Sequence, residues 1–71
     1  MNIEKRALEE AVKRAGSQAN LAKAIGKTQG HITVWLNRSK RAPADAVLAI
    51  ESATGVSRHE LRPDVFGKSA A

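Results

Sequence analysis

The chain has 71 residues, about half of a typical domain of roughly 100 to 150 residues, which excludes a second domain and a large ligand cavity. Twelve Lys and Arg against seven Asp and Glu give a net charge of +5, and the absence of cysteine excludes disulfides and thiolate zinc sites. The longest apolar run, Ala46 to Ile50, is only five residues long, and no apolar stretch follows the glutamates near the N-terminus. We therefore expect a cytoplasmic protein with neither a membrane span nor a secretory signal.

The excess positive charge lies in the middle of the chain. Residues 17–42 carry five Lys or Arg residues and no acidic residue, whereas residues 1–16 and 43–71 are each close to neutral. An acid-free block of this length is typical of a surface that binds a polyanion, and phosphate is the commonest polyanion. The alternative is a solvated surface that is basic by chance.

Five helices are expected from the spacing of apolar residues and from capping residues. The first runs from Ile3 to Ala15, with Asn2 as its N-cap and Gly16 ending it in the left-handed conformation. The second is only about two turns long and runs from Gln18 to Ile25, with the Ser17 hydroxyl as its N-cap.

A third helix, over residues 29–36, follows a Thr28 cap. Its apolar residues Ile32, Trp35 and Leu36 stand at positions i, i+3 and i+4 and are predicted to face the core. A cationic, turn-like segment from Asn37 to Ala42 is expected after it.

The fourth helix is predicted from Ala44 to Ala53, with Pro43 in its first turn and Thr54 and Gly55 as its stop. Its alanine-rich, apolar sequence favours a buried position in the centre of the bundle. No strand pattern is present, so the fold class predicted is all-α.

The last helix is expected from Arg58 to Arg62. Ser57 and Glu60 have the spacing of a capping box, and Pro63 is expected to end the helix. Residues 67–71 have nothing to bury and are expected to fray, so the folded domain is predicted to cover residues 1–66.

The window from Gln18 to Asn37 has the features of two helices that cross steeply over a short turn. Ala22 provides a small side chain where the helices touch, and Gly26 can adopt a positive φ at the turn. The alternative is a pair of core helices in a generic bundle. Such a pair would need the same apolar residues, but it would not predict Ala22 and Gly26 together beside an acid-free surface. We therefore predict a helix-turn-helix formed by the second and third helices of a compact five-helix bundle.

The side of the 29–36 helix opposite its apolar residues is free to contact a ligand. The candidate residues for DNA base recognition are Gln29, Gly30, Thr33 and Val34. Gln29 at the N-terminal tip can make a bidentate contact to adenine. Gly30 allows close approach to DNA, and Val34 can contact a thymine methyl group, the alternative being that Val34 packs partly under the fourth helix.

Polar and basic residues flank this surface. The candidate phosphate contacts are Gln18, Lys27, Thr28, His31, Asn37, Arg38, Lys40 and Arg41. Gln18 and Thr28 lie at helix N-termini, where backbone amides favour a phosphate oxygen, although each basic residue could equally be a solvated surface residue. The two histidines lie in different predicted helices, cysteine and tyrosine are absent, and no metal-ligand spacing appears, so we expect no catalytic residues, no metal and no cofactor.

A single recognition helix reads only a few base pairs, and operators normally need two, about 34 Å apart. We therefore expect a homodimer. The candidate dimer interface consists of the apolar residues Leu61, Val65 and Phe66 after the last cap. The alternative is that Phe66, the only phenylalanine, folds back on its own core.

Two stretches of the chain resemble known proteins. Gln18 to Gly26 and Ile32 to Leu36 resemble the helix-turn-helix of the phage Cro and lambda-repressor-like superfamily, and Ala49 to Phe66 is similar to the ending of YdaS-like, Cro-related prophage proteins. The resemblance implies a lambda-repressor-like, all-α DNA-binding repressor, sometimes an antitoxin. Gly30 departs from the family pattern, because relatives often carry a contacting side chain there.

These observations predict a Cro-like repressor that reads a double-stranded DNA operator through the major groove as a dimer. The alternative is an antitoxin that binds both its operator and a toxin protein, although few residues beyond Phe66 are present to bind such a partner. A protein- or RNA-binding helical module is a third possibility. No enzyme activity, small-molecule substrate or membrane partner is expected.

Overall fold

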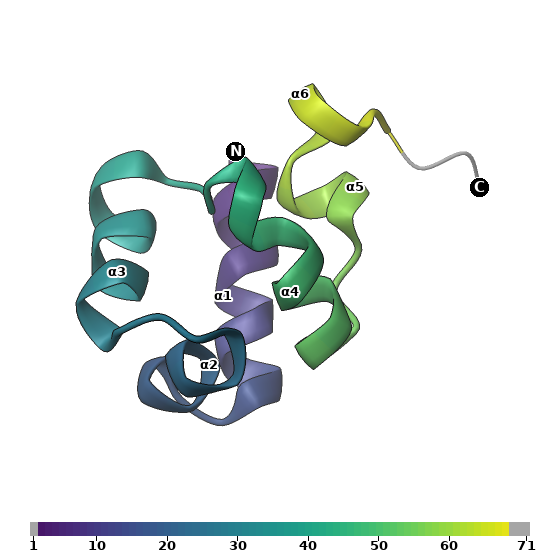
Figure 1. Cartoon of the computed structure of the whole chain (residues 1–71). Helices are drawn as coiled ribbons and strands as arrows, with labels where there is room; N and C mark the ends of the chain where they lie inside the picture. The colour runs from purple at the N-terminus through teal and green to yellow at the C-terminus, as the bar shows by residue number, and fades with distance from the viewer. Residues whose placement is uncertain (1, 69–71) are drawn as a thin grey trace.

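The computed structural model describes residues 2–68, and every regular element in that range is helical. The elements are α1 (Ile3–Ala15), α2 (Gln18–Ile25), α3 (Gln29–Val34), the π-helical turn η1 (Trp35–Ser39), α4 (Ala44–Thr54), α5 (Arg58–Leu61) and α6 (Pro63–Phe66). In Figure 1, α1 and α4 lie in the middle of the molecule, with α3 at one side and α5 and α6 at the other. The all-α prediction is confirmed, with six α-helices in residues 2–68 where five were expected.

The first two helices begin where the capping residues predict. The Asn2 side chain accepts a hydrogen bond from the Lys5 amide at 3.0 Å, and the Ser17 hydroxyl accepts one from the Asn20 amide at 3.0 Å. Gly16 ends α1 with a φ of 106° and a ψ of −31°, which is a positive φ but lies outside the left-handed helical region. One short-range hydrogen bond from a capping side chain therefore marks the start of each of these two helices.

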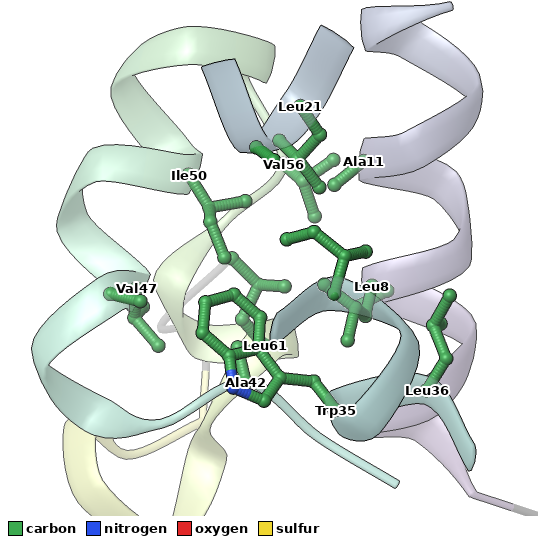
Figure 2. Close-up of a cluster of buried hydrophobic side chains, with 14 residues drawn as sticks. Leu8, Ala11, Leu21, Trp35, Leu36, Ala42, Val47, Ile50, Val56 and Leu61 are labelled. Carbon is green, nitrogen blue, oxygen red and sulfur yellow. The ribbon is translucent and has the colours of Figure 1, made fainter. Parts of the chain in front are cut away.

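The core is formed by one continuous cluster of apolar side chains, several of which Figure 2 shows gathered between α1 and α4. Its members are Ala7, Leu8, Ala11, Leu21, Ala22, Ile32, Trp35, Leu36, Ala42, Ala46, Val47, Ile50, Val56 and Leu61. Trp35 is only 7% exposed, which confirms its prediction as a core residue. Helices α1, α2 and α4 and the segment α3–η1 all contribute to this cluster, so the core holds the predicted helix-turn-helix against the remaining helices.

Helix α4 is less buried than its sequence predicts. Val47 and Ile50 are fully buried, whereas Leu48 is 49% exposed. Pro43 is the N-cap instead of a first-turn residue, and the helix ends at Thr54, one residue later than expected. The apolar composition suggested a central helix, but one face of α4 is open to solvent.

The segment after α3 stays helical for longer than predicted. The expected loop began at Asn37, but the π-helical turn η1 continues to Ser39, and Lys40 then leaves it with a φ of 62°. Lys40 is the one non-glycine residue with a positive φ among residues 2–68. The turn η1 begins with the buried residues Trp35 and Leu36, and its polar residues follow them directly. We attribute the helical form of this polar segment to the burial of these two side chains.

The C-terminal part also differs from the prediction. The Ser57 hydroxyl accepts from the His59 amide at 3.1 Å, so the expected pairing of Ser57 with Glu60 as a capping box is replaced by a bond to the second helical residue. Pro63 starts α6 as well as following α5, because a proline at the first helical position lacks only an N–H that would have no helical partner. Of the tail predicted to fray, residues 69–71 lie outside the described residues.

The candidate dimer residues have three different environments. Leu61 is fully buried within its own chain, so its assignment to an interface is corrected: it is a core residue that presents no surface to a partner. Phe66 is partly buried against the core, as the alternative interpretation expected, whereas Val65 is 50% exposed. The spacing of apolar residues in the sequence could not distinguish the buried, partly buried and exposed positions, because helix α6, which turns Phe66 back toward the bundle, was not predicted.

Candidate nucleic-acid interface

Helices α2 and α3 meet across a three-residue connection, Gly26 to Thr28, whose bends require the predicted residue types. Gly26 ends α2 in the left-handed conformation, with a φ of 74° and a ψ of 29°. The Lys27 amide then donates to the Ala22 carbonyl at 2.8 Å, and the Thr28 side chain caps α3. Ala22 is 2% exposed, so its small side chain lies in the core beside this turn. The predicted helix-turn-helix is thus present in the structure.

One face of α3 is open. The four candidate base-recognition residues Gln29, Gly30, Thr33 and Val34 are all exposed. Ile32, on the opposite side of the same helix, is fully buried. Val34 is 43% exposed, so the alternative in which it packs under α4 is not supported.

Gly30 is not required by the fold. A Cβ atom added at this position would meet only the Thr28 hydroxyl oxygen, at the ordinary contact distance of 3.6 Å. Its backbone is helical with no positive φ, so alanine would fit without strain. Because the space outside Gly30 is open, a ligand can approach the α3 backbone more closely here than beside any larger residue.

Thr33 links the two helices of the motif. Its hydroxyl donates to the Gln18 side-chain oxygen at 2.9 Å and lies 3.1 Å from the Gln29 carbonyl oxygen. The single hydroxyl hydrogen is therefore used inside the protein, and the Gln18 oxygen is held by it. The Gln18 amide NH₂ group remains as a donor for a ligand at the N-terminus of α2.

Thr28 and His31 form a capping box at the start of α3. The Thr28 amide donates to His31 Nδ1 at 3.1 Å, and the His31 amide donates to the Thr28 hydroxyl at 3.3 Å. The His31 ring also stacks on Trp35, with ring centroids 6.2 Å apart and an angle of 27° between planes. Sequence reasoning missed this box, because the capping-box signature has Glu or Gln at the position that His31 occupies.

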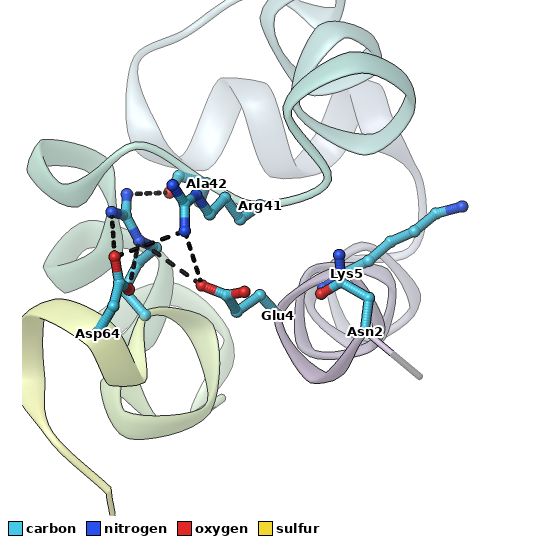
Figure 3. A network of polar contacts seen from close by, with 7 residues as sticks. Asn2, Glu4, Lys5, Arg41, Ala42 and Asp64 are labelled. Carbon is cyan, nitrogen blue, oxygen red and sulfur yellow. Dashed lines mark hydrogen bonds and ion pairs between the residues drawn. The ribbon is translucent and has the colours of Figure 1, made fainter.

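Three of the predicted phosphate contacts are basic residues whose charges are unpaired. Lys27, Arg38 and Lys40 are exposed, and none of them forms an ion pair with another residue in the 2–68 range. Arg41 differs, because its guanidinium lies 3.4 Å from Glu4 and 3.5 Å from Asp64 (Figure 3). The charge of Arg41 is therefore partly neutralised within the protein, in contrast to the charges of the other three cations.

A charged network surrounds Arg41 and connects distant parts of the chain. Arg62 donates to both oxygens of Asp64 at 2.9 and 2.8 Å and to the Ala42 carbonyl at 3.0 Å, and it lies 3.9 Å from Glu4. Its bonds lower the pKa of Asp64 to about 2. The network joins the start of α1, the loop before α4 and α6. Its carboxylates come from the near-neutral ends of the chain, so the charge count alone did not indicate it.

Within the described part of the chain, no group of three or more His, Cys, Asp or Glu residues could hold a metal ion. No helix in residues 2–68 is long and apolar enough to cross a membrane.

The crossing of α2 and α3 in an all-helical bundle places this protein in the Cro and lambda-repressor-like helix-turn-helix class. The model of the family described as bacterial toxin YdaS matches residues 8–70, and the chain belongs to this family. Its structure is similar to that of a Cro protein from a prophage element of Xylella fastidiosa strain Ann-1, with a TM-score of 0.81 and 39% identity, covering 94% of this chain and 98% of that chain. No curated protein matches the chain. The YdaS-like resemblance is confirmed.

Proposed function

We propose that this protein is a Cro-type transcriptional regulator that binds a double-stranded DNA operator through the major groove. The observation that carries the proposal is the exposed face of α3, flanked by unpaired cations within a 26-residue segment that contains no acidic residue. The similarity to a prophage Cro protein supports the same function. A phosphate-rich duplex fits this surface because nothing acidic in the motif would repel it.

The proposed base contacts come from the N-terminal part of α3, which enters the major groove in this class of motif. Gln29 would contact adenine through its amide, and Val34 would contact a thymine methyl group. Gly30 would let the α3 backbone approach the base edges. Thr33, whose hydroxyl hydrogen is engaged with Gln18, would contribute through its methyl group and by holding Gln18 in place.

The proposed phosphate contacts position the protein on the duplex. Lys27, Arg38 and Lys40 would neutralise phosphates, and Gln18 and Thr28 would contribute from the starts of their helices. Asn37 is exposed on η1 and would add a polar contact. Arg41 could contribute only by sharing its guanidinium with Glu4 and Asp64, so we expect it to contribute less than the unpaired cations.

The test is selection of bound duplexes from a random pool, followed by binding of two variants to the selected site. Gln29→Ala should relax the preference at one base pair per half-site and cost about 1 to 3 kcal/mol on the preferred sequence, with little effect on random DNA. The triple variant of Lys27, Arg38 and Lys40 to alanine should weaken binding to all sequences alike and flatten the salt slope by about three units. Wild-type protein that enriches no sequence would refute the proposal.

A toxin-antitoxin role is the second candidate, because the family is described as a bacterial toxin. As an antitoxin, the chain would bind its own operator and also a toxin protein. The two candidates share the DNA contacts and differ in the protein partner. Size-exclusion chromatography of the purified chain mixed with the product of the neighbouring gene would show a stable complex only for the antitoxin.

A further inference from the structure

The start of α3 is held by an unusual residue. His31 occupies the third position of the helix, and its side chain turns back so that Nδ1 lies 3.1 Å from the Thr28 backbone nitrogen and 3.0 Å from the Thr28 hydroxyl. A backbone N–H can only donate, so Nδ1 must be unprotonated to accept this bond. The closed box therefore requires a neutral imidazole whose proton is on Nε2.

A neutral ring changes what His31 can do for DNA binding. While the box is closed, His31 supplies no positive charge to the phosphate backbone, unlike Lys27 in the connection before α3. Its stacking on Trp35, itself 7% exposed, anchors the ring to the core. His31 thus connects the core to the backbone at which α3 begins.

The cap acts on the part of α3 that carries the proposed base contacts. Helix α3 begins at Gln29 and continues without a break into η1, and Gly30 in its first turn costs helical stability. Gln29 and Gly30 lie between Thr28 and His31, so the box encloses them. A first turn that contains glycine depends on its cap, because the first N–H groups of a helix have no partner within the helix and glycine adds conformational freedom there.

We propose that His31 is a positioning residue: its neutral imidazole fixes the first turn of α3 and so orients Gln29 toward the bases, and it is not a phosphate contact. This replaces the role predicted for His31 from sequence and rests on the proposed DNA-binding function. It implies that a side chain with an acceptor, and not one with a positive charge, is needed at this position.

Two matched substitutions separate the roles. His31→Gln keeps an acceptor of the kind found in capping boxes, whereas His31→Lys has only donors but adds a positive charge. We expect the Gln variant to bind the selected duplex within about twofold of wild type and the Lys variant to lose about fivefold, the size of a lost cap. A phosphate contact would give the reverse order, and His31→Gln would then flatten the salt slope by about one unit.

The base preference supplies a readout that general destabilisation would not change. The Lys variant should lose discrimination at the base pair that Gln29→Ala identifies, and combining the two substitutions should cost less than the sum of the single losses. Circular dichroism verifies that each variant is folded at the assay temperature. Unchanged base preference in a folded Lys variant, or tighter binding by Lys than by Gln, would overturn the positioning role.

The ring itself can be observed without DNA. Proton–nitrogen correlation spectra of the free protein should show the Nε2–H tautomer of His31, and the Thr28 amide should exchange faster in His31→Lys than in His31→Gln. An Nδ1–H tautomer would contradict the box. If the tautomer and exchange results hold but wild-type protein selects no duplex, the proposed function fails while the cap remains.

Discussion

Lys40 combines a backbone cost with an exposed charge. It holds a φ of 62° where the chain leaves η1, a conformation that costs a non-glycine residue about 1 to 2 kcal/mol. Glycine adopts this conformation freely but has more freedom to lose on folding. A lysine retained at such a position fits a function for its charge.

We predict that Lys40→Gly raises the free energy of unfolding by about 0.5 to 1 kcal/mol, the strain relieved less the added entropy of the unfolded glycine. The same variant should weaken DNA binding and reduce the salt slope by about one unit. Urea unfolding and binding titrations at several salt concentrations measure the two effects. The control is Lys40→Asn, because asparagine also tolerates the left-handed region. A lower free energy of unfolding for Lys40→Gly than for wild type would contradict the prediction.

Some single-residue roles could be predicted from sequence and others could not. The caps at Asn2 and Ser17 follow from residue type and from the helical pattern that begins after them. The role of His31 does not, because histidine can accept, donate or carry charge, and only the 3.1 Å approach of Nδ1 to the Thr28 amide selects among these. The orientation of the Thr33 hydroxyl is likewise set by the crossing of α2 and α3.

Gly30 is a position at which helix stability and the proposed DNA binding favour different residues. Because a Cβ atom there meets only the Thr28 hydroxyl at 3.6 Å, Gly30→Ala should raise the free energy of unfolding by about 0.5 to 1 kcal/mol through better helix propensity. If the α3 backbone approaches the bases closely, the added methyl group should weaken binding to the selected duplex. Thermal unfolding and a binding titration of the same variant test both; a variant with greater stability and unchanged affinity would exclude close approach at Gly30.

The elements at the C-terminal end are held by charge as well as by packing. The paired Arg62 guanidinium keeps the pKa of Asp64 near 2, below its usual value of 3.8. A carboxyl group whose pKa is lowered by folding stabilises the fold above its unfolded pKa and loses that contribution as the pH falls through the folded value. The contribution of Asp64 should therefore be complete above about pH 4 and vanish toward pH 2.

We predict that Asp64→Asn is less stable than wild type at pH 7 and that the two proteins converge between about pH 4 and pH 2. Urea unfolding of both proteins at pH 7, 4 and 2 measures the difference directly. Ser52→Asn, at an exposed position on α4, provides a control for the substitution itself. A difference that persists unchanged at pH 2 would mean that Asp64 acts through packing and not through its charge.

Element boundaries were predictable where capping residues and apolar spacing agreed, as for α1 and α2. They were less predictable after Trp35, because a π-helical turn has the same local composition as a polar loop and is selected by the burial of Trp35 and Leu36. Helix α6 was missed because Pro63 is compatible with both the end of one helix and the start of another. In both cases the local sequence is compatible with two structures.

At the scale of the whole molecule, charge is separated along the chain, and one ion-pair network joins the separated parts. The acid-free segment contains the motif, and its last cation, Arg41, pairs with Glu4 and Asp64 from the two ends of the chain. Of the cations predicted to meet phosphate, Arg41 alone is paired by this network. The basic composition therefore indicated the segment that carries the unpaired cations Lys27, Arg38 and Lys40, but it could not distinguish Arg41 from them, because the pairing of Arg41 depends on how both chain ends fold.

An operator with two half-sites would require a homodimer of this protein. Leu61 is buried and Phe66 packs on its own core, so of the three candidate interface residues only Val65, 50% exposed on α6, has a side chain largely free to meet a partner. Val65→Asp should give a folded protein of monomeric mass in sedimentation, with weaker and less cooperative binding to a palindromic duplex, because an aspartate would be desolvated in an apolar contact. Leu48→Asp, at a position 49% exposed on α4, is the matched control and should leave the mass unchanged. Dissociation by Leu48→Asp and not by Val65→Asp would move the interface to the open face of α4.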